Sequence, residues 1–358
     1  MIHYKFSRNS DKDFARVLRQ RVNAYFEEAS IGKNANGQMV TKTIIALSLY
    51  LLPYIVIMTA GISNLYIIFG LWALAGLGKA IVGTTVMHDS VHGSYSKNQS
   101  INKIMSISAP LLGVSGKVWK FQHNVLHHTY TNIEHADEDI SPRFVLRFSP
   151  HQPKYWFHRY QWLYVPIIYG VSTMIWVFTK DYFKMAHYKE MGLVKTGKEY
   201  NLYILGMTVR KLIYLFFALA LPYMVLGVSF GLIFLMFATM HFVAGISLSL
   251  IFQPAHVIED ADFIEQEEAQ IDRGWWAHQL YTTSNFAVKN KFITWVTGGL
   301  NHQVEHHLFP NICHIHYPKI ASIVRETAAE FNLPYYAQES FVGAVGSHFK
   351  MLRLLGRP

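Results

Sequence analysis

The longest uncharged stretch of the sequence is Leu212–Ile258, which reads LIYLFFALALPYMVLGVSFGLIFLMFATMHFVAGISLSLIFQPAHVI. It contains no Asp, Glu, Lys or Arg over 47 residues. A helix that crosses a bilayer needs about 20 apolar residues, so this stretch is long enough for two. Gly227–Ser229 interrupts it near the middle. The pattern predicts a helical hairpin that crosses a membrane and returns, with spans at about 210–228 and 230–252.

A second hairpin is predicted upstream. Residues 43–62 contain no charged residue over 20 positions, and residues 65–87 contain only Lys79. Ser63 and Asn64 form a polar break between the two runs. A pair of buried core helices is the alternative, but both runs are long and nearly uncharged, which favours transmembrane helices. A fifth apolar stretch, 162–179, is 18 residues long and carries aromatic residues at both ends.

The composition of the whole chain agrees with a membrane protein. Charged residues make up 15% of the 358 residues, against about 25% in an ordinary soluble protein. This excludes an average soluble enzyme, and a single cysteine excludes a disulfide framework and a site ligated by several cysteines. The net charge of +9 lies outside the hairpin turns. By the positive-inside rule it marks cytoplasmic segments, so we expect no nucleic-acid partner.

The first 42 residues are polar and lack the apolar core of a signal peptide. Residues 11–28 alternate apolar and charged side chains at helical spacing, which predicts a surface helix. We therefore expect a cytoplasmic N-terminal segment at 1–42, followed by one membrane domain at 43–358.

Histidine is unusually frequent, with 19 copies, and the polar segments carry three dense clusters of it. The clusters start at His88, His123 and His302. Residues four apart share one face of a helix, so histidines at that spacing can grip one ion, while the second member of each His-His doublet points to another side. Imidazole suits zinc, copper, iron and nickel. Eight clustered histidines are too many for one ion, which favours a two-metal site: His88, His92, His123, His127, His128, His302, His306 and His307.

The histidine clusters must lie on one side of the membrane in order to meet. Three apolar stretches separate the second cluster from the third, and an odd number of crossings would keep them apart. We expect 162–179, the shortest stretch, to lie in the interface or to re-enter. The prediction is an all-α integral membrane protein with four transmembrane helices, a cytoplasmic cap at 88–209 and 257–358, and both termini in the cytoplasm.

Longer motifs around the clusters resemble the membrane fatty acid desaturase family. They are HDSVHGSYS, WKFQHNVLHHTYTNIEHADEDI and GGLNHQVEHHLFPNICHIHYPKI, at 88–96, 119–140 and 298–320. The resemblance implies a non-haem di-iron centre beneath a cytoplasmic cap and a desaturation that uses O2. It also implies an additional histidine ligand after the fourth span, which matches His256. The implied iron ligands are His88, His92, His123, His127, His128, His256, His306 and His307.

Gln303 stands where most of these desaturases have the first histidine of the third box. This glutamine resembles the front-end branch, which inserts a cis double bond between an existing one and the carboxyl end, and the bacterial and cyanobacterial members look most similar. Whether Gln303 or His302 reaches iron stays open. No segment resembles a fused cytochrome b5, so the resemblance implies a separate electron donor, either ferredoxin or cytochrome b5. The resemblance to bacterial members implies a location in a bacterial inner membrane.

Carboxylates and amides beside the histidines are expected to hold the imidazoles through their second nitrogen. The candidates are Asp89, Asn132, Asp137, Asn301 and Glu305, with Trp119, Glu134 and Asp139 nearby. A solvated acidic loop is an equal alternative for 134–139. The substrate is expected to be a fatty acyl lipid or an acyl-CoA, and no residue is assigned to it. Rival functions are a hydroxylase, an acetylenase or a sphingoid-base desaturase, and a metal- or haem-binding membrane protein without catalysis.

Overall fold

A computed structural model describes residues 4–7, 10–141, 144–265 and 270–357. The prediction of an all-α membrane protein is confirmed. Helices dominate the described residues, and the strands form only two short parallel pairs. The strands are β1 (Lys5–Phe6) with β2 (Gln270–Ile271), and β3 (Ser284–Phe286) with β4 (Tyr336–Gln338).

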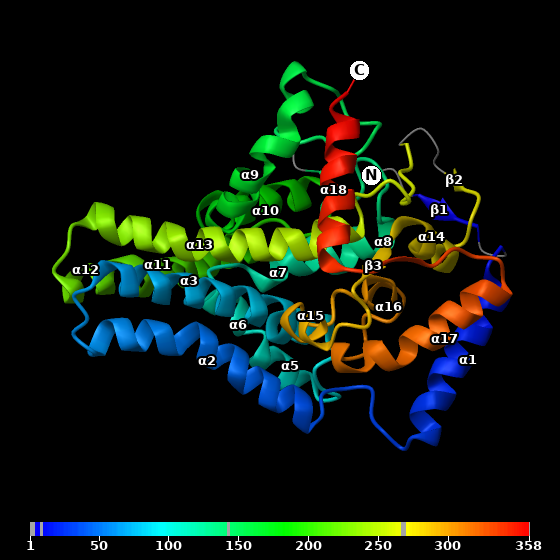
Figure 1. Cartoon of the computed structure of the whole chain (residues 1–358), viewed down its shortest axis with the longest axis horizontal. Helices are drawn as coiled ribbons and strands as arrows, with labels where there is room; N and C mark the ends of the chain where they lie inside the picture. Colours follow the sequence, from blue (N-terminus) through cyan, green and yellow to red (C-terminus); the bar gives the residue numbers. More distant parts are fainter. Residues whose placement is uncertain (1–3, 8–9, 142–143, 266–269, 358) are drawn as a thin grey trace.

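Two helical hairpins form the elongated end of the molecule (Figure 1). The first joins α2 (Gly37–Thr59) to α3 (Leu65–Val82). Asn64 starts α3 by accepting hydrogen bonds from the backbone of Tyr66 and Ile67. The second hairpin contains a π-helical turn and consists, in chain order, of α11 (Lys198–Leu215), the turn Phe216–Ala220, α12 (Leu221–Leu226) and α13 (Phe230–Phe252).

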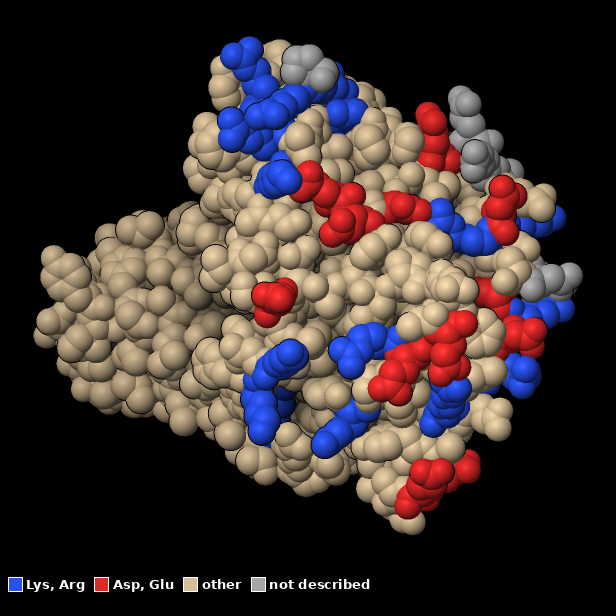
Figure 2. Space-filling model, turned by 45° about the vertical axis from the view of Figure 1, so that its right-hand side comes forward, with Lys and Arg blue, Asp and Glu red and all other residues tan. Residues whose placement is uncertain are grey.

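The two hairpin turns lie at the same end of the bundle, and Figure 2 shows no Lys, Arg, Asp or Glu on the visible face of that end. Among the described residues, five helical stretches are long and apolar enough to cross a membrane. Four of them belong to the hairpins. The fifth, Trp156–Glu190, contains the apolar stretch that we expected in the interface.

Glycines let helix α3 lie between α2 and α13 with its backbone almost in contact with both. A Cβ on Gly76 would lie 2.4 Å from the carbonyl oxygen of Met240 in α13. A Cβ on Gly78 would lie 2.4 Å from the backbone of Leu49 in α2. Small residues at such crossings are typical of membrane helices, where close van der Waals packing replaces the hydrophobic effect between helices.

The fifth apolar stretch forms α9 (Gln161–Ile175), a π-helical turn and α10 (Asp181–Glu190). Helix α9 crosses α13 where Gly245 leaves room for the carbonyl of Tyr169. At one end, the Gln161 amide donates to Leu352 O in α18 (Phe341–Leu355), over 2.8 Å. At the other end, Asp181 accepts the Ser115 N–H over 2.9 Å. Since both ends contact segments outside the hairpins, an interfacial position remains our prediction for this stretch.

A chain of buried hydrogen bonds ties the apolar helices together. The ammonium of Lys79 donates to Tyr214 OH over 2.9 Å, and this hydroxyl lies 2.9 Å from Nε2 of His241. Nδ1 of His241 lies 3.0 Å from the hydroxyl of Thr173 in α9. His241, which no histidine motif contains, therefore has partners on both ring nitrogens and a role in packing.

The remaining helices form a polar cap around one end of the hairpins. Helix α1 (Lys12–Glu28) matches the surface helix expected at 11–28, and it lies beside α17 (Tyr317–Glu330). Phe14 and Leu18 bury their side chains in the core shared with α17, and Arg21 forms a bidentate ion pair with Glu330 at 2.7 and 2.8 Å. The other cap helices are α4 (His88–His92), α5 (Gln99–Met105), α6 (Ser108–Leu111), α7 (Gly116–Trp119), α8 (His128–Tyr130), α14 (Trp275–Thr282), α15 (Lys291–Val296) and α16 (Gln303–Leu308).

Candidate metal centre

The first histidine pair continues the second apolar helix. After α3, the π-helical turn Gly83–Met87 leads directly into α4, which begins at His88 and ends at His92. Gly93 stops the helix in a left-handed conformation, with φ of 77°, which glycine adopts without steric cost. The pair therefore lies where the apolar span meets the cap.

A π-helical segment, Lys120–His127, carries most of the second histidine cluster. In a π-helix the backbone bonds from i to i+5, so His123 and His128 come onto one face. Their Nε2 atoms are 3.3 Å apart. The two histidines of the doublet thus point to different sides, as expected, but Nε2 of His128 lies beside that of His123, whereas α-helical spacing pairs His123 with His127. Short π segments inside helices often occur at functional sites.

The other histidines come from the C-terminal half of the chain. His306 and His307 are neighbours on α16, and His256 follows α13 after one 3₁₀ turn, Gln253–Ala255. All three are buried. Segments that are more than 200 residues apart in the sequence thus meet at one point, as in the 218-residue separation between His88 and His306.

The Nε2 atoms of these histidines converge. Nε2 of His306 lies 3.2 Å from that of His88, 3.3 Å from that of His123 and 3.0 Å from that of His128. Among the described residues, two sets made of histidines alone have donor atoms within 4.8 Å of one another and could each hold a metal ion. One set is His88, His92, His123 and His306, and the other is His127, His256 and His307.

The outer ring nitrogens explain which atoms face inward, since most of these histidines bond through Nδ1 to an acceptor outside the cluster. Nδ1 of His127 lies 3.0 Å from both oxygens of Asp137, for example. With the proton on Nδ1, a neutral imidazole presents its Nε2 lone pair to the centre. The other pairs are His88 with Asp89 (3.3 Å), His123 with Asp139 (3.1 Å), His256 with Thr282 O (3.2 Å), His306 with Tyr317 OH (3.2 Å) and His307 with Gln279 Oε1 (2.8 Å).

Lone pairs that face one another repel unless a cation lies between them. Nε2 of His92, of His256 and of His307 is buried and has no hydrogen-bond partner among the described residues. Buried polar atoms are otherwise almost always paired. The inward nitrogens therefore fit a metal, and an all-imidazole donor set suits zinc, copper, iron or nickel better than magnesium or calcium.

Burial keeps most of the cluster neutral. Desolvation, followed by the neighbouring imidazoles, holds the pKa of His123, His306 and His307 well below the usual range. His127 differs: burial lowers its pKa, but Asp137 and Asp139 raise it more, and the net direction is upward. Deprotonated imidazoles are the form that binds metal.

The residues expected to support the histidines divide into two groups. Asp89, Asp137 and Asp139 bond to imidazoles as given above. Asn132 supports them indirectly, since its N–H donates to Asp137 over 2.9 Å and its side chain donates to His256 O over 3.0 Å.

Asn301 and Glu305 contact none of the metal-site imidazoles. Asn301 donates to Phe286 O over 3.1 Å and shapes a loop. Glu305 accepts hydrogen bonds from Asn285 and Tyr335, both at 2.9 Å. These two bonds occupy both oxygens of the Glu305 carboxylate. The expectation that Glu305 holds an imidazole is therefore not met by this geometry.

Gln303 is fully buried, and neither atom of its amide has a hydrogen-bond partner within the described part of the chain. Both ring nitrogens of His302 also lack hydrogen bonds there, and Glu305 lies 3.7 Å from its Nδ1. Trp119 stacks on His123 with ring centroids 4.4 Å apart.

Sequence reasoning missed Gln279, Thr282 and Tyr317, because nothing in their own segments signals a partner for a distant histidine.

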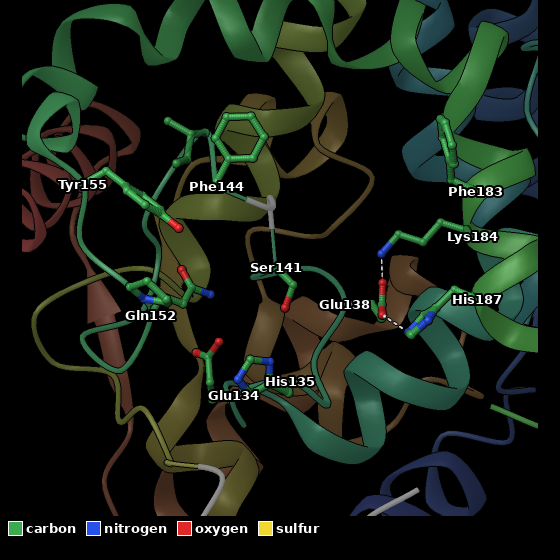
Figure 3. Close-up of a pocket in the computed structure, with 12 residues that line it drawn as sticks. Glu134, His135, Glu138, Ser141, Phe144, Gln152, Tyr155, Phe183, Lys184 and His187 are labelled. Atoms are coloured by element: carbon green, nitrogen blue, oxygen red, sulfur yellow. Dashed lines mark ion pairs between the residues drawn. The ribbon is translucent and has the colours of Figure 1, made fainter. Parts of the chain in front are cut away.

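The acidic loop at 134–139 has two sides. Asp137 and Asp139 face the histidines, whereas Glu134 and Glu138 line a surface pocket of about 470 Å³ (Figure 3). Glu138 forms ion pairs with Lys184 and His187 of α10, the latter at 3.3 Å. Support of the histidines therefore fits Asp137 and Asp139, whereas Glu134, which is 4% exposed, and Glu138, whose side chain is 10% exposed, are too buried for a solvated acidic surface.

Comparison with known proteins agrees with this arrangement. Residues 63–339 match the model of the fatty acid desaturase family. The acyl-lipid (8-3)-desaturase of Physcomitrium patens is 37% identical over 97% of this chain and 72% of its own length. The sn-1 linoleoyl-lipid 6-desaturase of Synechocystis sp. is 34% identical over 97% of this chain and 96% of its own length. This chain, with its converging histidines at the base of two apolar hairpins, belongs to the fatty acid desaturase family.

Proposed function

We propose that the protein is a front-end acyl-lipid desaturase, which uses O2 to place a cis double bond between an existing double bond and the carboxyl end of the chain. The observation that carries this proposal is the convergence of imidazole Nε2 atoms at the membrane end of the cap. Front-end specificity is supported by Gln303 and by relatives named as 6-desaturases, (8-3)-desaturases and a delta(5) desaturase.

The proposed cofactor is a pair of iron ions. One ion would be held by His88, His92, His123 and His306, with His128 beside them, and the other by His127, His256 and His307. Gln303 remains a candidate ligand because its buried amide has no partner among the described residues. Bound iron supplies the oxidation of an unactivated CH2 group by O2, which no side chain can perform.

The protein residues have separate tasks in this proposal. Asp89, Asp137 and Asp139 hold three imidazoles by Nδ1, which directs each Nε2 inward. Because each carboxylate contacts an imidazole and not an ion, the proposed histidine ligands remain neutral. The buried cap excludes water, which protects the oxidation from side reactions. The apolar hairpins place the site at the depth where an acyl chain can enter from the bilayer.

The proposed topology has four crossings, with the histidine motifs and both termini in the cytoplasm and the enzyme in a bacterial inner membrane. The proposed division is an N-terminal segment at 1–42 and a desaturase domain at 43–358. Its support is the placement of both hairpin turns at the end away from the charged cap. Electrons would come from a separate ferredoxin or cytochrome b5, and the substrate is an acyl lipid rather than acyl-CoA, as the relatives' names indicate.

Expression in a host that lacks polyunsaturated acids, supplied with isotope-labelled linoleate, tests this function. Mass spectrometry should locate one new double bond on the carboxyl side of the existing one, first in membrane glycerolipids. Labelled hydroxy acid or a triple bond, with no new double bond, would instead identify a hydroxylase or an acetylenase. No labelled product, together with haem or zinc as the only bound group after growth in iron-rich medium, would leave a metal-binding protein without this catalysis.

A further inference from the structure

His88 lies at one end of a chain of buried hydrogen bonds that reaches the first apolar helix. Its Nδ1 lies 3.3 Å from Oδ1 of Asp89, and Oδ2 of Asp89 lies 2.8 Å from Nδ1 of His314. Nε2 of His314 lies 2.9 Å from the ammonium nitrogen of Lys42 in α2. None of the four residues is more than 4% exposed. The chain joins α2, α4 and the segment after α16.

Each bond in this chain has only one possible direction. The ammonium of Lys42 has donors and no acceptor, so Nε2 of His314 must accept. The proton of neutral His314 is then on Nδ1, where it is donated to Asp89. A carboxylate only accepts, so the other oxygen of Asp89 takes the Nδ1 proton of His88. Nε2 of His88 is left as a lone pair, which faces Nε2 of His306 at 3.2 Å.

A third metal ion is the competing interpretation of this place. Asp89, Cys313 and His314 offer donor atoms within 4.8 Å of one another. However, the N–H and the ring Nδ1 of His314 are both bonded to Asp89. The remaining ring nitrogen is taken by Lys42, whose positive charge would repel a second cation. A hydrogen-bonded chain accounts for the contacts of both ring nitrogens of His314 without an ion.

We propose that Lys42 and His314 are positioning residues, which hold His88 in the tautomer that presents Nε2 to the metal. The proposal rests on the metal centre under "Proposed function". Without the ammonium, His314 can place its proton on Nε2 and turn a lone pair toward Asp89, whose carboxylate then loses its main side-chain partner. Residues one shell outside the ligands change metal affinity by about 10- to 100-fold.

The first experiment measures Fe2+ release from the full-length protein, loaded anaerobically in detergent, into a colorimetric ferrous chelator. We expect Lys42→Met to release one ion about 10- to 100-fold faster than the unsubstituted protein, and Lys42→Arg, which keeps a cationic donor, to release it at nearly the original rate. Lys79→Met is the matched control. Lys79 is also a buried lysine, but it donates to Leu112 O and Tyr214 OH, outside the chain.

A second pair of variants tests the tautomer itself. His314→Asn places an amide NH2 at the position of Nδ1, where it donates to Asp89 without needing a lysine to set its direction. His314→Ala removes the donor. We expect His314→Asn to hold iron at least about 10-fold longer than His314→Ala. In the His314→Asn background, Lys42→Met should change the rate of iron release little further. Independent packing defects do not produce such coupling between two substitutions.

Equal release from Lys42→Met and the unsubstituted protein overturns the proposal, as does equal release from Lys42→Met and Lys79→Met. If Lys42→Met does not fold, as judged by size-exclusion chromatography, the His314→Asn and His314→Ala pair decides the question, and equal release from these two refutes it. Failure of the metal centre itself is separate, because the unsubstituted protein would then retain no Fe2+ at the start of the experiment.

Discussion

Asp137 offers the most direct perturbation of the proposed centre. Its carboxylate is fully buried and lies 3.0 Å from Nδ1 of His127 through both oxygens. It also accepts the N–H of Asn132 at Oδ2, over 2.9 Å, and that of Asp139 at Oδ1, over 2.8 Å. In Asp137→Asn the shape is kept, but one of these oxygens becomes an NH2 group. Whichever way the amide turns, one backbone N–H faces another donor.

The expected cost has two parts. A buried donor without a partner costs about 1–3 kcal/mol, which should lower the thermal stability of the loop without unfolding the protein. The charge that favours the Nδ1–H form of His127 is also lost, so affinity for the ion at His127 should fall by about 10- to 100-fold. Iron content after dialysis against a weak chelator, read by inductively coupled plasma mass spectrometry, should fall from two ions per chain toward one, together with double-bond formation.

Glu134→Gln is the control for Asp137→Asn. Glu134 lies in the same loop and is 4% exposed, but it lines the surface pocket instead of facing the histidines. It should therefore keep the iron content and activity of the unsubstituted protein. If Asp137→Asn retained both ions and full activity, or if Glu134→Gln lost as much iron, the carboxylates would not act through the imidazoles as argued.

Three further predictions concern the ligands, the bundle and pH. His307→Ala should abolish product and reduce bound iron while the protein stays in the membrane fraction. The control His135→Ala, at an exposed histidine, should change neither product nor bound iron. Normal desaturation in His307→Ala would remove His307 from the ligand set. Gly76→Val, whose side chain would meet backbone 2.4 Å away, should destabilise the protein by at least about 1–3 kcal/mol, whereas Gly70→Val on the same helix has open space and should not; equal thermal stabilities would contradict the packing of α3. Burial lowers the pKa of His348 in α18 to about 4, so His348 binds more protons in the unfolded chain, where its pKa is about 6.5, than in the folded protein between these values. This one residue should therefore add about 3 kcal/mol to the rise in stability from pH 4 to 6.5 and nothing further above it. Thermal unfolding across that range should show a flatter rise in His348→Gln, and an unchanged pH slope would count against this assignment.

Features that depend on composition alone could be predicted from the sequence. Uncharged runs of about 20 residues have few alternatives to membrane helices, and the hairpin breaks at Ser63–Asn64 and Gly227–Ser229 coincide with the observed turns. The relation of Trp156–Glu190 to the membrane could not be predicted as firmly. Its position depends on contacts at both ends, with α18 and with Ser115, that no local pattern encodes.

The histidine motifs could be found by spacing, but not the geometry that makes them converge. An α-helical reading of the second motif places His128 apart from His123, and only the π-helical segment brings their Nε2 atoms to 3.3 Å. A residue that bonds to the outer ring nitrogen of a histidine was predictable where it is adjacent to that histidine in the sequence, as Asp89 is to His88. Gln279 and Tyr317, which serve His307 and His306, come from other helices and become visible only once the chain is folded.

Asp89 and Glu305 show why adjacency to a histidine is not sufficient. Both are acidic, buried and next to a clustered histidine. Asp89 reaches back to His88 because His314 and its N–H hold the second carboxylate oxygen in place. Both oxygens of Glu305 accept hydrogen bonds from other groups, the side chains of Asn285 and Tyr335. The partner that fixes the far oxygen decides which carboxylate supports an imidazole, and that partner lies elsewhere in the sequence.

The placement of charge around the centre fits what the proposed pair of buried iron ions would require. Cations taken out of water need nearby negative charge, yet carboxylates bound directly to iron would make it richer in electrons and a weaker oxidant. Here Asp89, Asp137 and Asp139 stand one imidazole away from the inward Nε2 atoms. They offset the charge of the proposed ions while the ligands themselves stay neutral. Moving one of these carboxylates into direct contact with iron should therefore keep the metal and weaken the oxidation, which separates binding from catalysis at this site.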